Sequence, residues 1–234
     1  MSDSVVSLSA VSKDYRGLRP LRIEHLDLAR GDRVALLGLD QVAAEVLANL
    51  ITGATLPETG EVRIFGRMTS SINDADEWLA VTDRIGIVSE RAVLLESMTV
   101  LQNLAMPFSL EVEPPAPDVE AQAVRLADAV ALPEPLLHQR TGEIGPAARV
   151  LLRLARALAL TPGLLLLEHP TARVSRQDVP RLADQIRETA ERQATALLVV
   201  TGDEEFGRRV ATRVLRHDPA TGRLQPVRRG WFAR

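Results

Sequence analysis

The chain has 234 residues, of which 46% are hydrophobic and 25% charged, and its formal net charge is −3. These values describe an ordinary globular protein with ample length for a core, and the lack of a basic excess argues against nucleic acid as a partner. Without cysteine, the chain has no disulfide and no thiolate metal site, which agrees with a cytoplasmic location. The first residues do not resemble a secretory signal, and the apolar runs are far shorter than the ~20 residues of a membrane span. Any membrane role is therefore expected to come through a partner.

The first half of the chain reads as strands followed by one amphipathic helix. Alternating residues predict strands over 5–12 and 21–28, and a buried strand follows over 33–37. Apolar residues recur at helical spacing over 42–51, with Gly53 suited to the helix end, and a further strand is expected over 61–65. The polar segment 69–83 carries no clear periodic pattern.

The second half alternates buried strands with helices. The expected strands cover 85–88, 164–167 and 196–200, and one or two edge strands are expected over 213–227. The expected helices cover 118–132, 150–160, 178–193 and the segment from 204 to 210, and residues 100–110 are expected to be helical at first, before Pro107. This order predicts an α/β fold with a mainly parallel core sheet, right-handed crossovers and an antiparallel β edge. We expect one domain over residues 1–234, with a helical subdomain inserted at about 97–160.

The strand at 33–37, the turn at Gly38 and the helix after it have the layout of a phosphate-binding loop. Such a loop reads G-x-x-x-x-G-K-[ST], and its backbone N–H groups and lysine surround the phosphates. Here the second glycine, the lysine and the hydroxyl residue fall on Ala43, Ala44 and Glu45. Lys13 is the single lysine of the chain, so no other lysine can replace the missing one.

The order of segments resembles the ATP-binding subunit of an ABC transporter over nearly the whole chain. Several short sequence segments, spaced as in that family, carry the resemblance: VSKDY at 11–15, GDRVALLG at 31–38, TGEVRIFG at 59–66, IGIVSE at 85–90, MTVLQNL at 98–104, RLARAL at 153–158 and LLLLEHPT at 164–171. The resemblance implies a P-loop NTPase-like fold and an ATPase. It also implies that Tyr15 stacks on adenine, and that residues near Gly38 and Asp40 surround the phosphates.

The positions that carry the chemistry of this family are all altered. Besides the three phosphate-loop changes, the departures lie in the Q-loop (Glu90), the signature loop (Gly145, Pro146, Ala147), Walker B (Glu168), the catalytic glutamate position (His169), the D-loop (Ser175) and the switch histidine position (Gly202). Losing the lysine removes roughly 1.5–3 kcal/mol, and an ionised Glu45 adds a repulsion of about 4 kcal/mol. A loss of roughly 6 kcal/mol would turn a micromolar site into one of about ten-millimolar affinity. We therefore expect no cofactor, at most weak binding of Mg-ATP, and no metal ligand.

These departures favour a pseudo-ATPase that is a structural or regulatory partner of a membrane permease. No catalytic residue is expected; His169 is a candidate general base, but it lacks a held phosphate on which to act. Two alternatives stay open. One is a working ATP-binding and hydrolysing transporter subunit with unconventional residues, and the other is a soluble scaffold that binds an intact ATPase subunit.

The resemblance also implies partners and a location. Docking on the permease is expected through the region from Glu90 to Leu110, although a plain core helix explains residues 100–110 equally well. A homodimer or a heterodimer with another ABC ATPase subunit is expected, at the inner face of the cell membrane. The sequence does not give the transported substrate or the direction of transport.

One structural prediction concerns the phosphate loop itself. Without the second glycine, and with helix-favouring residues over 41–45, the loop is expected to wind into helix with Asp40 as its cap. Asp40 or Glu45 would then place a carboxylate at the helix N-terminus, where a phosphate would otherwise lie.

Overall fold

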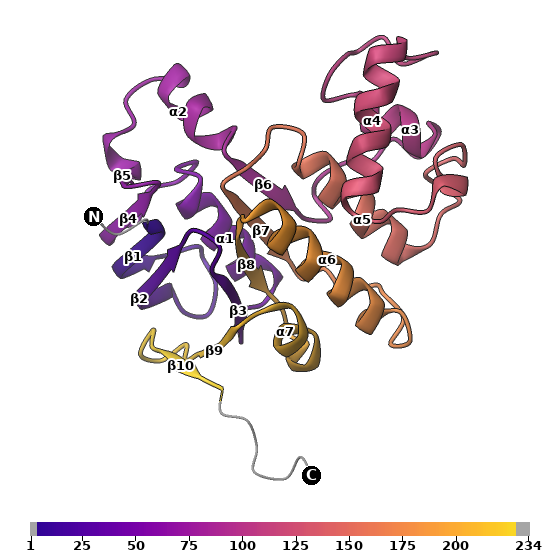
Figure 1. The fold of residues 1–234 in the computed structure, drawn as a ribbon. Helices are drawn as coiled ribbons and strands as arrows, with labels where there is room; N and C mark the ends of the chain where they lie inside the picture. The colour runs from indigo at the N-terminus through magenta and orange to yellow at the C-terminus, as the bar shows by residue number, and fades with distance from the viewer. Residues whose placement is uncertain (1–3, 228–234) are drawn as a thin grey trace.

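The structure is a computed structural model, and it describes residues 4–227 (Figure 1). The strands form an antiparallel sheet of order β2-β1-β4-β5 and a six-stranded sheet of order β10-β9-β3-β8-β7-β6. In chain order the strands are β1 Ser4–Lys13, β2 Leu21–Ala29, β3 Arg33–Leu37, β4 Thr59–Ile64, β5 Arg67–Met68, β6 Ile85–Val88, β7 Leu164–Glu168, β8 Ala196–Val200, β9 Arg213–His217 and β10 Leu224–Pro226. The predicted α/β fold with an antiparallel sheet is confirmed.

The six-stranded sheet is parallel except at one edge. Strands β9, β3, β8, β7 and β6 run parallel to one another, and β10 pairs with β9 in the antiparallel sense. One or two edge strands were expected at 213–227; two strands are present, but β9 lies inside the sheet beside β3 and β10 is at the edge. All parallel strands therefore end at one common edge of the sheet.

Seven α-helices connect and cover the described strands: α1 Gln41–Ile51, α2 Ala75–Thr82, α3 Val100–Ala105, α4 Pro117–Ala129, α5 Pro146–Ala157, α6 Val179–Gln193 and α7 Glu204–Val210. The helix expected in the first part of 100–110 ends before Pro107, as predicted. The one at 150–160 begins earlier, since Pro146 occupies its first position. Helix α2 was not predicted; among its residues only Val81 is buried, and the Asp74 side chain caps its N-terminus.

The fully buried strands are explained by the two hydrophobic clusters that cover the parallel sheet. Leu164 and Leu166 of β7 pack in the cluster that contains α1 and the antiparallel sheet. Leu165 and Leu167 pack in the cluster that contains α3 to α7. Because successive side chains of a strand point to opposite faces, a strand covered on both faces is apolar throughout.

Helices α3, α4 and α5 lie together at one end of the molecule, away from the antiparallel sheet (Figure 1). They fall within the segment 97–160 that was expected to be a helical subdomain. Its status as a separate unit stays a prediction.

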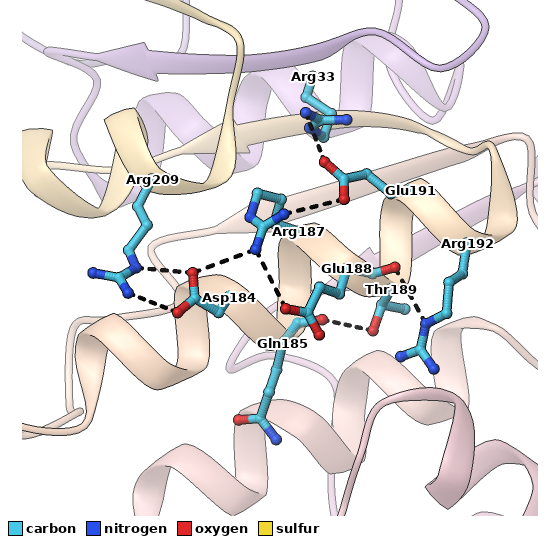
Figure 2. Close-up of polar contacts among 9 residues, drawn as sticks. All are labelled: Arg33, Asp184, Gln185, Arg187, Glu188, Thr189, Glu191, Arg192 and Arg209. Atoms are coloured by element: carbon cyan, nitrogen blue, oxygen red, sulfur yellow. Dashed lines mark hydrogen bonds and ion pairs between the residues drawn. The ribbon is translucent and has the colours of Figure 1, made fainter.

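Ion pairs hold α6 against its neighbours (Figure 2). On the side of α7, Asp184 accepts two hydrogen bonds from Arg209, at 2.9 and 2.7 Å. On the side of the sheet, Nη2 of Arg33 lies 2.9 Å from Oε1 of Glu191. Arg187 lies between these two contacts and pairs with both Asp184 and Glu191. The pKa of the Asp184 carboxyl is lowered, chiefly by its hydrogen bonds with Arg209.

Candidate functional site

The carboxyl ends of the parallel strands bring most of the predicted site residues to one edge of the sheet. Gly38 follows β3, Glu90 follows β6, Glu168 ends β7 and Gly202 follows β8. In open α/β sheets, ligands bind outside this edge. The sequence-based grouping of these residues is therefore consistent with their positions in the fold.

Residues 41–45 of the phosphate-loop segment are helical and Asp40 caps them, as predicted. Helix α1 begins at Gln41, and Oδ1 of its N-cap residue Asp40 accepts a hydrogen bond from the Ala43 N–H at 2.8 Å. Gly38 has a φ of +91°, and a side chain there would approach the His217 carbonyl oxygen to 3.0 Å. Glycine is thus required at the turn, and the Asp40 carboxylate lies at the helix N-terminus.

The two alanines of this segment face inward. Ala43 is 5% exposed and Ala44 is 0% exposed, and both belong to the cluster beneath α1. A longer side chain at residue 44 would therefore have to displace packed neighbours.

Arg91 joins two carboxylates across the edge of the sheet. Its Nη1 lies 3.0 Å from Oε1 of Glu45 on α1, and its Nη2 lies 2.6 Å from Oε1 of Glu168 at the end of β7. The Glu168 side chain has 0% exposure, whereas that of Arg91 is 41% exposed. Arg91 was not among the residues predicted for the site. Glu45 was expected at the helix N-terminus as an alternative to Asp40, but it pairs with Arg91 while Asp40 forms the cap.

The residues around Arg91 are held from several sides. Glu90 pairs with Arg173 at 2.9 Å, and the Arg91 N–H donates to the Ser89 hydroxyl at 3.1 Å. Two arginines of α5 donate hydrogen bonds to the backbone carbonyl groups of the two residues after Arg91. Arg153 donates to Ala92 at 3.1 Å, and Arg156 donates to Val93 at 2.7 Å. We call residues 89–93 the strap, because their polar contacts reach α1, β7 and α5.

His169 and Gly202 line a second region of the edge, a cavity of about 620 Å³ that also contains Thr171, Thr201 and Glu204. His169 has a φ of +43°, and its N–H donates to the Val200 carbonyl at 2.8 Å. Its Nε2 is buried with no partner among the described residues. The structure thus places His169 and Gly202 at one cavity.

Tyr15 lies near the start of α1. Together with Asp40 and Val42 it lines a cavity of about 440 Å³, and partial burial and the Asp40 charge raise the pKa of its phenol. The signature-like residues are elsewhere: Gly145 is the N-cap of α5, followed by Pro146 and Ala147. Within residues 4–227, no recorded polar contact joins these three to Glu45, Arg91 or Glu168.

The order of strands and helices around this edge agrees with the protein family that the sequence matches. The profile of the ABC transporter family matches residues 21–172. The chain belongs to this family. It is similar to the "Lipoprotein-releasing system ATP-binding protein LolD" of Hydrogenovibrio crunogenus, with 30% identity over 207 residues that cover 87% of this chain and 89% of the relative. The protein of that name from Xanthomonas axonopodis pv. citri is 29% identical, with coverage of 95% and 92%.

Solved structures show the same fold. The dimeric ATP-binding cassette MJ0796 bound to ADP and Pi superposes with a TM-score of 0.74 at 22% identity, covering 97% of this chain and all of that chain (100%). The cbiO1 protein of Clostridium perfringens gives a TM-score of 0.78 at 17% identity, with coverage of 95% and 87%. The predicted ABC ATPase fold is confirmed. No helix within residues 4–227 is long and apolar enough to cross a membrane.

Proposed function

We propose that this chain is the ATP-binding-type subunit of a membrane transporter, LolD-like in its sequence, and that it acts without hydrolysing ATP. The observation that carries the proposal is the contact of Arg91 with both Glu45 and Glu168. These two residues stand where the family motif has the hydroxyl and the aspartate that face the nucleotide and its magnesium.

The residues present do not fit Mg-ATP. Phosphate groups need N–H donors and cations, whereas Glu45 and Glu168 bring two carboxylates to that region. The Arg91 guanidinium lies beside them and is already paired with both. Ala44 is fully buried at the lysine position, and Asp40 accepts the Ala43 N–H at the start of α1. Each of these features supports a site that is closed to a nucleotide.

A groove beside the strap supports docking on a permease through the region from Glu90 to Leu110. It has a volume of about 350 Å³ and is lined by Ile87, Ala92, Met106 and Pro107 together with Arg153 and Arg156. Desolvation lowers the pKa of both arginines, and each donates to a strap carbonyl rather than to a carboxylate. An apolar floor with two cationic groups suits a partner segment with apolar and acidic side chains.

The same proposal covers assembly and location. The names of the relatives refer to a releasing system with an ATP-binding protein, and the MJ0796 cassette is dimeric. We infer that this chain pairs with a second ATPase-type subunit, which is either another copy of this chain or a subunit with intact ATPase motifs. The pair lies beneath an integral membrane permease at the inner face of the membrane.

A second candidate function is a working ATP-binding and hydrolysing subunit. Two observations favour it: the relatives are named as ATP-binding proteins, and Arg91 is 41% exposed, so its side chain has room to swing away from Glu168. Nucleotide would then enter only after Arg91 leaves. A soluble scaffold that binds an intact ATPase subunit is a third candidate; no particular contact favours it.

The test has two parts. The chain is purified from its native membranes with its partners, and ATP hydrolysis is measured for the complex and for the isolated chain. We expect an integral membrane protein to co-purify and the isolated chain to show no hydrolysis. Turnover by the isolated chain that is lost in Glu168→Gln would overturn the pseudo-ATPase proposal. Co-purification of a soluble ATPase subunit alone would favour the scaffold.

A further inference from the structure

A cavity of about 630 Å³ lies at the amino ends of the parallel strands, on the side of the sheet opposite the edge that holds Glu168. Its walls are the start of β1, the turn between β4 and β5, and the segments that lead into β6, β7 and β8. Small-molecule sites in proteins span roughly 300–1,000 Å³. The cavity therefore has room for a ligand of metabolite size, and it shares no residue with the candidate nucleotide site.

The charges that line this cavity are all positive. Arg30 and Arg84 line it, and no aspartate or glutamate does. Within residues 4–227, neither guanidinium group forms an ion pair or a hydrogen bond. An adjoining cavity of about 420 Å³ differs in this respect, because its Asp32 pairs with Arg213 at 3.0 Å. The larger cavity thus offers positive charge that carboxylates of the described chain leave uncompensated.

The Arg84 guanidinium is held in place by an aromatic ring. Its central carbon lies 3.8 Å from the centroid of the Phe65 ring. Phe65 and Gly66 form the two-residue turn between β4 and β5, and both have a positive φ, of +50° and +80°. Such turns favour Asn, Asp and Gly, so an aromatic residue at the first position costs free energy. A guanidinium stacked on a ring keeps the N–H donors at its edge available to a carboxylate or a phosphate.

The uncharged polar groups of the cavity are also chiefly donors. The Thr161 hydroxyl and the Gln193 amide line it and have no hydrogen-bond partner within residues 4–227. The ends of α5 and α6 are close by, but backbone N–H groups already occupy carbonyl groups there. Leu158 accepts from Thr161 at 2.9 Å, and Ala190 accepts from Thr195 at 3.1 Å. Free donors beside two cations suit an oxyanion.

We propose that this cavity binds a small organic anion, whose carboxylate or phosphate group accepts hydrogen bonds from Arg84 and Arg30. The oxygens of such a group match the paired N–H donors of a guanidinium. The ligand would connect the turn after β4 with the segments that lead into β6, β7 and β8. Its binding requires no nucleotide at the opposite edge of the sheet.

The experiment titrates the full chain with inorganic phosphate, glycerol 3-phosphate and citrate at low ionic strength, without nucleotide or divalent cations. Calorimetry gives the affinity, and NMR follows the amide signals of residues 65–66, 84–85, 161, 163 and 193–195. We expect glycerol 3-phosphate or citrate to bind with a Kd below roughly 1 mM. Tighter binding of the first indicates a phosphate ester as the natural ligand, and tighter binding of the second indicates a polycarboxylate. Both results support the proposal.

Substitutions of the exposed arginines locate the site. Arg84→Gln and Arg30→Gln each remove one guanidinium group, and each is expected to weaken binding at least about tenfold, because charge-assisted hydrogen bonds are lost. Arg84→Lys keeps the charge without the planar group and is expected to weaken binding several-fold. Arg63→Gln is the control: it makes the same change of charge in the adjoining cavity, where Arg63 pairs with Glu61 at 3.2 Å. Its affinity is expected to equal that of the wild type.

Several outcomes would overturn the proposal. They are the lack of saturable binding of both organic anions up to roughly 10 mM, binding of inorganic phosphate alone, and wild-type affinity in both Arg84→Gln and Arg30→Gln. An equal loss of affinity in Arg63→Gln would show a general attraction of anions instead of a site. Because neither ATP hydrolysis nor co-purification is measured, failure here is distinguishable from failure of the proposed function.

Discussion

The Nη2 atom of Arg91 lies 2.6 Å from Oε1 of Glu168, a carboxylate with no exposed side-chain surface. This contact links the strap after β6 to the end of β7, at the edge of the sheet where α/β proteins bind their ligands. Since the same guanidinium also reaches Glu45 on α1, three segments that lie far apart in the sequence are joined to one another here.

Restoring the phosphate-loop residues is expected to restore nucleotide binding only if Arg91 is also removed. The triple variant Ala43→Gly, Ala44→Lys and Glu45→Thr regains the lysine and the hydroxyl once the lysine has displaced the packed neighbours of residue 44, but Arg91 still pairs with Glu168. Adding Arg91→Ala is expected to tighten binding of a fluorescent ATP analogue at least about tenfold, which corresponds to about 1.4 kcal/mol. Adding Arg173→Ala instead serves as the control and is expected to have no effect. Equal affinity with and without Arg91 would show that it does not block the site.

The strap is expected to loosen when the arginines of α5 are replaced. Arg153 and Arg156 donate to the carbonyl groups of Ala92 and Val93, so Arg153→Gln with Arg156→Gln removes both charge-assisted bonds. Amide hydrogen exchange over residues 89–94 is expected to accelerate several-fold. Arg192→Gln on α6, whose guanidinium donates to carbonyl groups outside the strap, is the matched control. Unchanged exchange in the double variant would mean that these bonds do not hold the strap.

The pairing of α6 with α7 is expected to depend on pH through Asp184 (Figure 2). Because its hydrogen bonds with Arg209 lower the pKa of Asp184 in the folded chain, its contribution to stability is present above the ordinary pKa of about 4. This contribution is lost as the pH falls through the lower pKa of the folded state. Asp184→Asn is expected to lower the Tm at pH 7, and the difference from the wild type should shrink progressively as the pH falls below about 4. A difference that stays constant from pH 7 to pH 3 would exclude this linkage.

Close packing of β6 against α5 is expected to make Gly86 intolerant of a side chain. A Cβ atom at this position would lie 2.7 Å from the Ala157 carbonyl oxygen and 2.8 Å from Leu165. Gly86→Ala is expected to lower the free energy of unfolding by roughly 1–3 kcal/mol, measured with urea. Gly202→Ala is the control, because nothing lies within 4 Å of its added carbon. If both variants unfold at the same urea concentration, β6 and α5 are less tightly packed than described.

Local patterns predicted much of the fold. The four leucines at 164–167 indicated a strand covered on both faces, and the two clusters on either side of β7 explain them. Asp40 before a helix-favouring stretch predicted the start of α1. By contrast α2 was missed, because a helix that buries a single residue leaves no apolar stripe in the sequence.

The decisive contact of the site was not predictable in the same way. Arg91 is one of many arginines and belongs to no recognised motif. Its partners Glu45 and Glu168 are 46 and 77 residues away in the sequence. Its role depends on β6 lying beside β7, and strand order is a property of the tertiary fold. The useful signal was position: Arg91 comes shortly after a buried strand, at the carboxyl edge where ligands bind.

The most direct test of this account is an equilibrium titration of the purified wild-type chain with ATP in the presence of Mg²⁺. With Arg91 bound to Glu45 and Glu168, and Ala44 buried at the lysine position, we predict no saturable binding below roughly millimolar ATP. Saturable binding at micromolar ATP by the unmodified chain would contradict the claim that its own side chains close the nucleotide site.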